Sequence, residues 1–196
     1  MRYVLISIAL VLMACSKGPP PADPSSQAAT AQPVAAKAPE AAPAVEKAPA
    51  PFTADQLRTG CPVGRRIVYK IEEEGKPLVR RTLEFVGNDA NGAEIKGTTA
   101  DASGKELDSG TSKSTWTELR SHGEFDKSRL EIKHRTVSVP FGTVETTVYK
   151  VQDPDGTVTT YYFADTMPGP PVLIYVDNKD GKRIRTQTME SSTGVK

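Results

Sequence analysis

The stretch RIVYKIEEEGKPLVRRTLEFVGNDANGAEIKGTTAD, residues 66–101, indicates the fold class of this 196-residue chain. It contains three runs, 66–73, 77–86 and 92–101, that are rich in β-branched, aromatic and alternating polar residues. Turn residues separate the runs, and Asn91-Gly92 is the strongest short-range hairpin signal known in sequences. The stretch therefore predicts three consecutive antiparallel strands.

The remainder of the chain repeats this pattern. Five further runs (130–139, 143–151, 157–164, 172–176 and 182–190) alternate with breaks that contain Pro-Phe-Gly, Pro-Asp-Gly, Pro-Gly-Pro-Pro or Asp-Gly. Such breaks are typical of tight turns. Apolar residues occur on both faces of several runs, which favours a strongly curved sheet over a flat, one-sided one. The sequence thus predicts a mainly β fold: a curved antiparallel sheet or half-barrel of about eight strands, with one or two short helices.

Two short helices are predicted from capping boxes, in which a Ser or Thr is followed three residues later by Glu or Gln. Thr53 with Gln56 predicts a helix over 54–59, and Thr115 with Glu118 predicts one over 116–121. Trp116, the only tryptophan, would anchor the second helix against the sheet. Packing in the core is the favoured role for Trp116, and stacking against a ligand is the alternative.

The N-terminus is typical of a secretory signal. Arg2 precedes about a dozen apolar or small residues, a run shorter than the roughly 20 residues of a membrane-spanning helix.

Leu12-Met13-Ala14-Cys15 resembles the lipobox of bacterial lipoproteins, although Met13 is bulkier than that family prefers. The resemblance implies that residues 1–14 are a signal peptide and that Cys15 is acylated, with palmitate among its chains. Because Ser16 is not aspartate, it also implies anchoring in the outer membrane, with the domain in the periplasm or exposed at the surface.

Residues 15–51 are predicted to be a disordered tether. Positions 18–51 contain nine prolines and twelve alanines, with almost nothing large and apolar to bury. Such a composition cannot offset the entropy of ordering and favours polyproline II conformations. Fully extended, these residues would span roughly 105 Å, at about 3.1 Å per residue.

Residues 52–196 are predicted to form a single domain, which is long enough for a real core. They contain 21 basic and 21 acidic residues, so the basic excess typical of nucleic-acid binding is missing. Cys61 is the only cysteine besides Cys15. Burial is its favoured state, and pairing with another chain is the alternative.

No stretch of the sequence indicates catalysis or a cofactor. The two histidines, His122 and His134, lack nearby cysteines or carboxylates at metal-ligand spacing, so no metal site is expected. Nucleophile-elbow, Walker and dinucleotide-binding patterns are missing. The two carboxylates of a glycosidase site can be distant in sequence, so the sequence leaves such a site as an alternative. We expect a protein that is not an enzyme and has no cofactor.

In its order of elements, the chain resembles the Lol-type lipoprotein carriers and receptors of the bacterial envelope. A lipobox, a tether, a short helix and an antiparallel sheet with a helical insertion follow one another in both. The resemblance implies a half-barrel whose concave side holds acyl chains. Two functions follow as expectations: binding of a lipid or other apolar ligand, or, with a filled core, docking of an envelope protein.

Four residues are predicted to face such a ligand: Trp116, Phe163, Met167 and Leu173. The last three bracket the loop around Pro168-Gly169-Pro170-Pro171, which proline makes stiff. A stiff loop with apolar flanks suits the mouth of a cavity. For Met167, a place in the core is the favoured alternative.

Overall fold

A computed structural model describes residues 45–194 of the chain. The predicted signal peptide, the acylation site at Cys15 and the tether up to residue 44 lie outside these residues. The described elements are α1 (Ala54–Gly60), β1 (Arg66–Glu73), β2 (Val79–Asn88), β3 (Gly92–Asp101), β4 (Glu106–Thr115), α2 (Trp116–Ser121), a 3-10 turn (Lys127–Arg129), β5 (Leu130–Val139), β6 (Gly142–Gln152), β7 (Val158–Ala164), β8 (Leu173–Asp177) and β9 (Arg183–Thr193).

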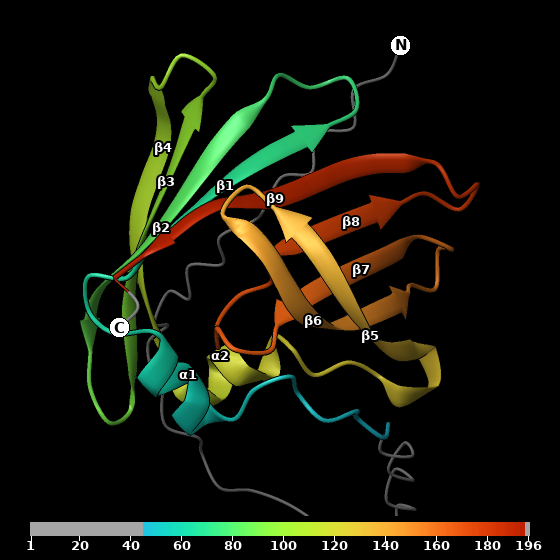
Figure 1. The fold of residues 1–196 in the computed structure, drawn as a ribbon, viewed down its shortest axis with the longest axis horizontal. Coiled ribbons are helices and arrows are strands. Elements are labelled where there is room, and N and C mark those ends of the chain that lie inside the picture. Colours follow the sequence, from blue (N-terminus) through green and yellow to red (C-terminus); the bar gives the residue numbers. More distant parts are fainter. Residues whose placement is uncertain (1–44, 195–196) are drawn as a thin grey trace, which may run out of the picture. The chain divides into compact units, whose positions relative to one another are not determined.

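All nine strands belong to one antiparallel sheet, in the order β4-β3-β2-β1-β9-β8-β7-β6-β5. The sheet consists of two meanders, β1–β4 and β5–β9, which are joined where β1 pairs with β9. Within the described residues β4 and β5 do not pair with each other, so the sheet stays open. It curves strongly, and α1 and α2 lie together at one end of its hollow (Figure 1). The predicted fold class, a mainly β curved antiparallel sheet with short helices, is confirmed.

The number of strands differs from the prediction by one. The missing strand is β4, whose sequence ELDSGTSKST contains a single large apolar residue. Nearly all of its side chains are exposed, because it is an edge strand that is held by its backbone pairing with β3. A strand of this kind has no apolar alternation by which a sequence could reveal it.

Both predicted helices are present, and both begin with the expected capping box. The Thr53 hydroxyl accepts a hydrogen bond from the Gln56 backbone, and the Gln56 side chain accepts one from the Thr53 backbone. Thr115 and Glu118 make the same reciprocal pair at α2. Trp116 is buried, and its indole Nε1 donates to the Asp89 carbonyl at 2.9 Å, which ties α2 to the β2–β3 turn.

Contacts with the domain begin before the expected start at Phe52. We call residues 46–52 the N-terminal segment. The Ala48 amide donates to the Phe125 carbonyl at 2.9 Å, and the Tyr149 hydroxyl donates to the Pro49 carbonyl at 2.9 Å. The Lys47 ammonium pairs with Asp126. This segment therefore lies against the part of the chain between α2 and β6.

Candidate functional site

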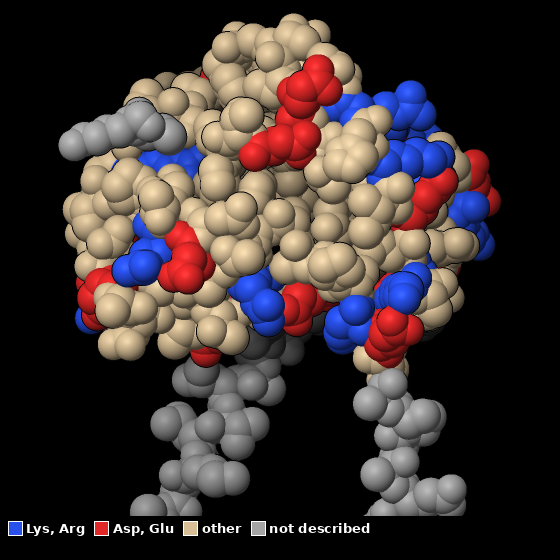
Figure 2. Space-filling view, turned by 60° about the horizontal axis from the view of Figure 1, so that its bottom comes forward, with Lys and Arg blue, Asp and Glu red and all other residues tan. Residues whose placement is uncertain are grey.

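An apolar cavity lies between the inner face of the sheet and the two helices. Its volume is about 310 Å³. Figure 2 views the domain with its helix end turned forward, and uncharged residues fill most of this surface while charged groups form small mixed clusters. The cavity is lined by Pro51, Phe52, Leu57, Cys61, Leu83, Phe85, Ile95, Leu119, Arg120, His122, Gly123, Tyr161, Phe163, Gly169, Pro170, Pro171 and Ile174.

One side of the cavity is aromatic. Phe163 of β7 packs edge to face against Phe52, with ring centroids 6.1 Å apart, and against Tyr149, at 5.5 Å. Tyr161 stacks on Phe125 at 5.1 Å. Edge-to-face and offset-stacked rings are the favoured arrangements of aromatic pairs. The N-terminal segment therefore contributes Phe52 to a wall that is built mainly by β6 and β7.

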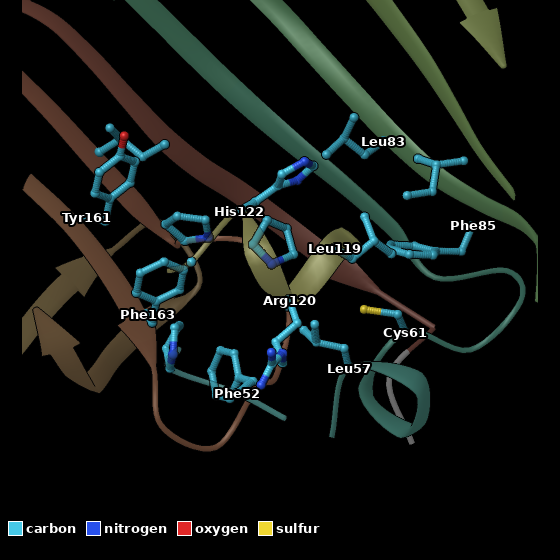
Figure 3. Close-up of a pocket in the computed structure, with 17 residues that line it drawn as sticks. Phe52, Leu57, Cys61, Leu83, Phe85, Leu119, Arg120, His122, Tyr161 and Phe163 are labelled. Atoms are coloured by element: carbon cyan, nitrogen blue, oxygen red, sulfur yellow. The ribbon is translucent and has the colours of Figure 1, made fainter. Parts of the chain in front are cut away.

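The opposite side is built by the first meander and the helices. Leu83 and Phe85 alternate along β2 and so share one face, and Ile95 pairs with Phe85 across the β2–β3 ladder. Leu57 of α1 and Leu119 of α2 complete this side. Figure 3 shows Leu83 and Phe85 facing Tyr161 and Phe163 across the cavity, with the α2 side chains between them.

Few polar groups reach the cavity. Arg120 is paired with Glu124, with 2.6 Å between Nη2 and Oε1. The exposed His122 is the other basic side chain of the lining, and no carboxylate belongs to it. Burial raises the pKa of the Cys61 thiol, and the nearby Arg65 only partly offsets this effect. Burial likewise raises the pKa of the Tyr161 phenol. Raised pKa values keep both groups neutral, so these lining groups suit an apolar ligand better than acid–base chemistry.

The β7–β8 loop forms the floor of the cavity through Gly169, Pro170 and Pro171. Two buried side chains hold this loop in place. The Arg65 guanidinium donates to the Pro168 carbonyl, and the Tyr69 hydroxyl donates to the Pro171 carbonyl at 2.8 Å. Complete burial raises the pKa of Tyr69 well above its ordinary value, so the phenol keeps the proton it donates.

The four residues predicted to face a ligand lie in different places. Phe163 lines the cavity, whereas Trp116, Met167 and Leu173 do not belong to its lining. Trp116 and Leu173 are buried in the core, and the half-buried Met167 packs against it. Whether any of the four contacts a ligand stays a prediction. The loop bracketed by Phe163, Met167 and Leu173 does reach the cavity, but through its glycine and two of its prolines.

The predicted histidines lie apart in the fold. His122 follows α2 at the cavity, while His134 is on β5, with its Nδ1 atom 3.4 Å from the Thr147 hydroxyl. Among residues 45–194, no group of three or more His, Cys, Asp or Glu side chains is placed to hold a metal ion. No helix in this part of the chain is long and apolar enough to cross a membrane.

Sequence reasoning missed several residues that shape the site. Arg65 stands just before β1, where nothing in the pattern distinguishes it from the neighbouring Arg66, yet it is completely buried. Leu83, Ile95 and Leu119 come from separate elements, and only the tertiary fold brings them to one cavity. Their apolar character was visible in the sequence, but their common destination was not.

No family model matches the chain, and no curated protein matches it either. Several solved structures share its fold. MucB in the MucA/MucB complex of Pseudomonas aeruginosa aligns with a TM-score of 0.52 at 8% identity, over 72% of this chain and 56% of that one. A second structure of MucB, in complex with the periplasmic part of MucA, aligns with a TM-score of 0.50 at 10% identity, over 71% and 53%.

A protein from Bacteroides fragilis, described as exported and as having a YmcC-like fold, aligns at 14% identity over 67% of this chain and 96% of that one, with a TM-score of 0.45. This chain spans little more than half of the MucB chains it matches. At these identities the likeness to MucB concerns the fold, and a shared fold does not by itself transfer a function. The comparisons thus place this domain among open, curved antiparallel sheets that are also found in MucB.

Proposed function

We propose that the domain binds an apolar ligand, of which an acyl chain is the expected kind, in the cavity between the sheet and the helices. One observation carries this proposal: a cavity of about 310 Å³ whose lining is almost entirely aliphatic and aromatic. Cavities of roughly 300–1,000 Å³ with such linings are typical of small-molecule sites. The module is proposed to bind without catalysis and to need no cofactor.

The energy of such binding would come from burial. Each methylene group that leaves water for an apolar site contributes about 0.8 kcal/mol. A chain segment of a few methylenes would thus gain several kcal/mol, while the lining offers no carboxylate that would lose its water. A polar ligand would find few partners there.

The proposed location is the bacterial envelope, with a lipid anchor on Cys15. Two features support it: the resemblance of Leu12-Met13-Ala14-Cys15 to a lipobox, and a fold shared with MucB, which binds the periplasmic part of MucA. Several acyl chains would hold the protein lastingly, whereas one chain binds only marginally. The outer membrane is the proposed destination, because Ser16 is not the aspartate associated with retention at the inner membrane.

The anchor is tested by Cys15→Ser. The variant should carry no acyl chain in intact-mass measurements and should leave the membrane fraction after washing with salt and carbonate. Val45→Ser, which alters an exposed residue within the predicted tether, is the control and should stay bound. A Cys15→Ser protein that remains in the washed membrane would show that the anchor lies elsewhere.

A second candidate function is the docking of an envelope protein. The observation in its favour is the shared fold with MucB, whose structures contain MucA. In that case the cavity would be a packing defect without an occupant, and the exposed surface would carry the function. A co-purifying small molecule would separate the two candidates.

Native mass spectrometry of protein purified from its own membrane tests the ligand. We expect an apolar molecule to remain bound to the wild-type protein and to be lost from Leu83→Phe, which fills part of the cavity. Val86→Phe is the matched control, because Val86 lies on the same strand, is 41% exposed and does not line the cavity. An equal occupancy in both variants, or a wild-type protein that carries nothing, would count against the cavity as the binding site.

A further inference from the structure

Arg185 lies on the inner face of the sheet, next to the cavity. In the β8–β9 ladder, Gln187 pairs with Ile174, which lines the cavity, and Arg185 pairs with Val176, one step further along. Residues two apart on a strand share a face. The Arg185 side chain therefore rises from the same face as Ile174. Its charge is also felt by the phenol of Tyr161 on the neighbouring wall.

The Arg185 guanidinium is incompletely satisfied. Its Nη2 donates to the Gln187 side-chain oxygen at 3.1 Å, but its Nε is buried and has no partner. Within residues 45–194, no Asp or Glu oxygen lies within 4.0 Å of it. Glu73 is its cross-strand neighbour on β1, but the Glu73 carboxylate is paired with Lys76 at 2.5 Å. Asp153, near Tyr161, lies 3.9 Å from Arg129.

A second arginine stands on the same face of the sheet. Arg81 lies two residues from the cavity-lining Leu83 on β2, so both side chains project from one face. Arg81 is exposed and, in the described part of the chain, forms no ion pair. Within residues 45–194, the inner face thus carries two arginines without acidic partners: Arg81, two residues from the lining Leu83, and Arg185, diagonally across the β8–β9 ladder from the lining Ile174.

Burial of the Arg185 Nε atom costs free energy unless a hydrogen-bond acceptor is bound to it. A buried guanidinium nitrogen without an acceptor loses its water without compensation. The predicted domain is formally neutral, with 21 residues of each sign, so these arginines are not part of a general basic surface. Guanidinium groups bind phosphate and carboxylate oxygens in strong, often bidentate pairs.

We infer that the cavity's ligand is an anionic amphiphile, whose apolar chain lies in the cavity and whose phosphate or carboxylate group is bound by Arg185, with Arg81 supplying a second positive charge on the same face. This inference rests on the proposed function and specifies its ligand class. A neutral lipid of equal chain length would fill the cavity but leave the Nε atom of Arg185 without an acceptor.

Calorimetric titration of the full chain in phosphatidylcholine nanodiscs, with empty nanodiscs as the reference, tests the inference. Three probes separate its parts: octyl phosphate carries chain and charge, octyl glucoside carries the chain alone, and inorganic phosphate carries the charge alone. Octyl phosphate should bind about tenfold more tightly than octyl glucoside, a difference of about 1.4 kcal/mol. Inorganic phosphate should bind more weakly than either.

The preference should depend on one side chain. Arg185→Gln should remove most of the preference for octyl phosphate over octyl glucoside, with Arg81 supplying what remains, while Arg185→Lys, which keeps the charge, should retain more of it. Arg135→Gln is the matched control: Arg135 pairs with Thr146 on the other face of the sheet and also forms no ion pair in the described residues. It should leave both affinities unchanged.

The outcomes separate this inference from the proposed function. Equal binding of octyl phosphate and octyl glucoside by the wild-type protein would overturn the inference and leave the apolar site standing. Binding of neither would overturn the proposed function. If inorganic phosphate binds as tightly as octyl phosphate, the site binds an anion without a chain, and the inference is overturned. If Arg135→Gln loses as much of the preference for octyl phosphate as Arg185→Gln does, general surface charge is responsible, and the inference is likewise overturned.

Discussion

Arg65 joins three distant parts of the chain. Its completely buried guanidinium donates to the Gly60 carbonyl at 2.6 Å, to the Pro168 carbonyl, and to the Ser192 hydroxyl at 3.4 Å. No carboxylate within residues 45–194 balances its charge by an ion pair, and its Nη2 has no partner there. Burying a guanidinium in this way is expensive, so its hydrogen bonds to α1, the β7–β8 loop and β9 are the compensation. These bonds hold the floor of the cavity against its wall.

Gly169 shows how closely the loop approaches Arg65. A Cβ atom at this position would lie 2.8 Å from Nη1 of Arg65, and the backbone φ is +147°, a value that side chains rarely tolerate. Both constraints call for glycine. Of the three loop residues that line the cavity, Gly169 is thus the one that cannot carry a side chain.

Met167 offers a test of how the β7–β8 loop is seated. It is half-buried, packs against the core and does not line the cavity. Met167→Asp should lower the free energy of unfolding by about 2 kcal/mol or more, because the carboxylate would lose water without gaining a partner. Met167→Leu keeps the volume and should cost less than about 1.5 kcal/mol. Urea titration measures both, and an aspartate variant within about 1 kcal/mol of the wild type would mean that the side chain turns to solvent.

Among the elements, the helices were the most predictable and β4 the least. A capping box is a local signal, since two side chains three residues apart satisfy each other's backbone amides, and both boxes were visible in the sequence. β4 owes its conformation to a neighbouring strand that donates and accepts hydrogen bonds along its length. An edge strand that is polar on both faces also discourages pairing with other chains. Because β4 is exposed on both faces, its sequence is polar and has no apolar alternation from which a strand could be predicted.

The N-terminal segment acts as a structural element although it has no regular structure. Phe52 belongs to the aromatic wall, and Pro51 lies so close to Gly123 that a Cβ atom there would be 2.7 Å from its Cδ. The ion pair of Lys47 with Asp126 and the two backbone contacts at Ala48 and Pro49 hold the segment in place. The point where the tether joins the domain is therefore part of the cavity wall.

Acid should loosen this segment. Hydrogen bonds from Lys47, and then from Arg129, hold the pKa of Asp126 below its usual range. A carboxyl group whose pKa is lower in the folded protein stabilises it above the unfolded pKa, near pH 4, and this contribution disappears as the pH falls through the folded pKa. Hydrogen-exchange protection of the Ala48 amide, corrected for the intrinsic rate, should therefore fall below about pH 4.

Asp126→Asn should lower the Ala48 protection already at pH 7 and remove most of its further loss in acid. Asp55→Asn is the control, because Asp55 also pairs with an arginine, Arg58, but on the exposed face of α1. The explanation fails if both variants behave alike, or if Asp126→Asn retains the wild-type pH response.

In the whole domain, the pairing of β1 with β9 creates the cavity. It joins residues 66–73 to residues 183–193 and so brings the meander of Leu83, Phe85 and Ile95 opposite the meander of Tyr161 and Phe163. All strands of the two meanders except β4 could be predicted from local turns and alternation, and with them the fold class. The pairing of β1 with β9 could not be predicted, because no local signal specifies which strands pair when more than a hundred residues separate them. Because this long-range pairing decides which residues line the cavity, only Phe163 of the four residues predicted to face a ligand belongs to the lining.

The arrangement of tether and domain can be tested by limited proteolysis of the mature protein. The proline- and alanine-rich residues 18–44 should be cleaved by a broad-specificity protease, since nicking concentrates in segments that lack buried contacts. The resistant fragment should begin near Val45 rather than near Phe52, because the amide of Ala48 and the carbonyl of Pro49 are bonded to the domain. N-terminal sequencing of the fragment gives its start.

In Tyr149→Phe, which removes the bond to Pro49, the start should move towards Phe52 while Tyr161→Phe leaves it unchanged. A wild-type fragment that still contains residues 33–43 would contradict the predicted tether, and one that begins at Phe52 would contradict the docking of the N-terminal segment.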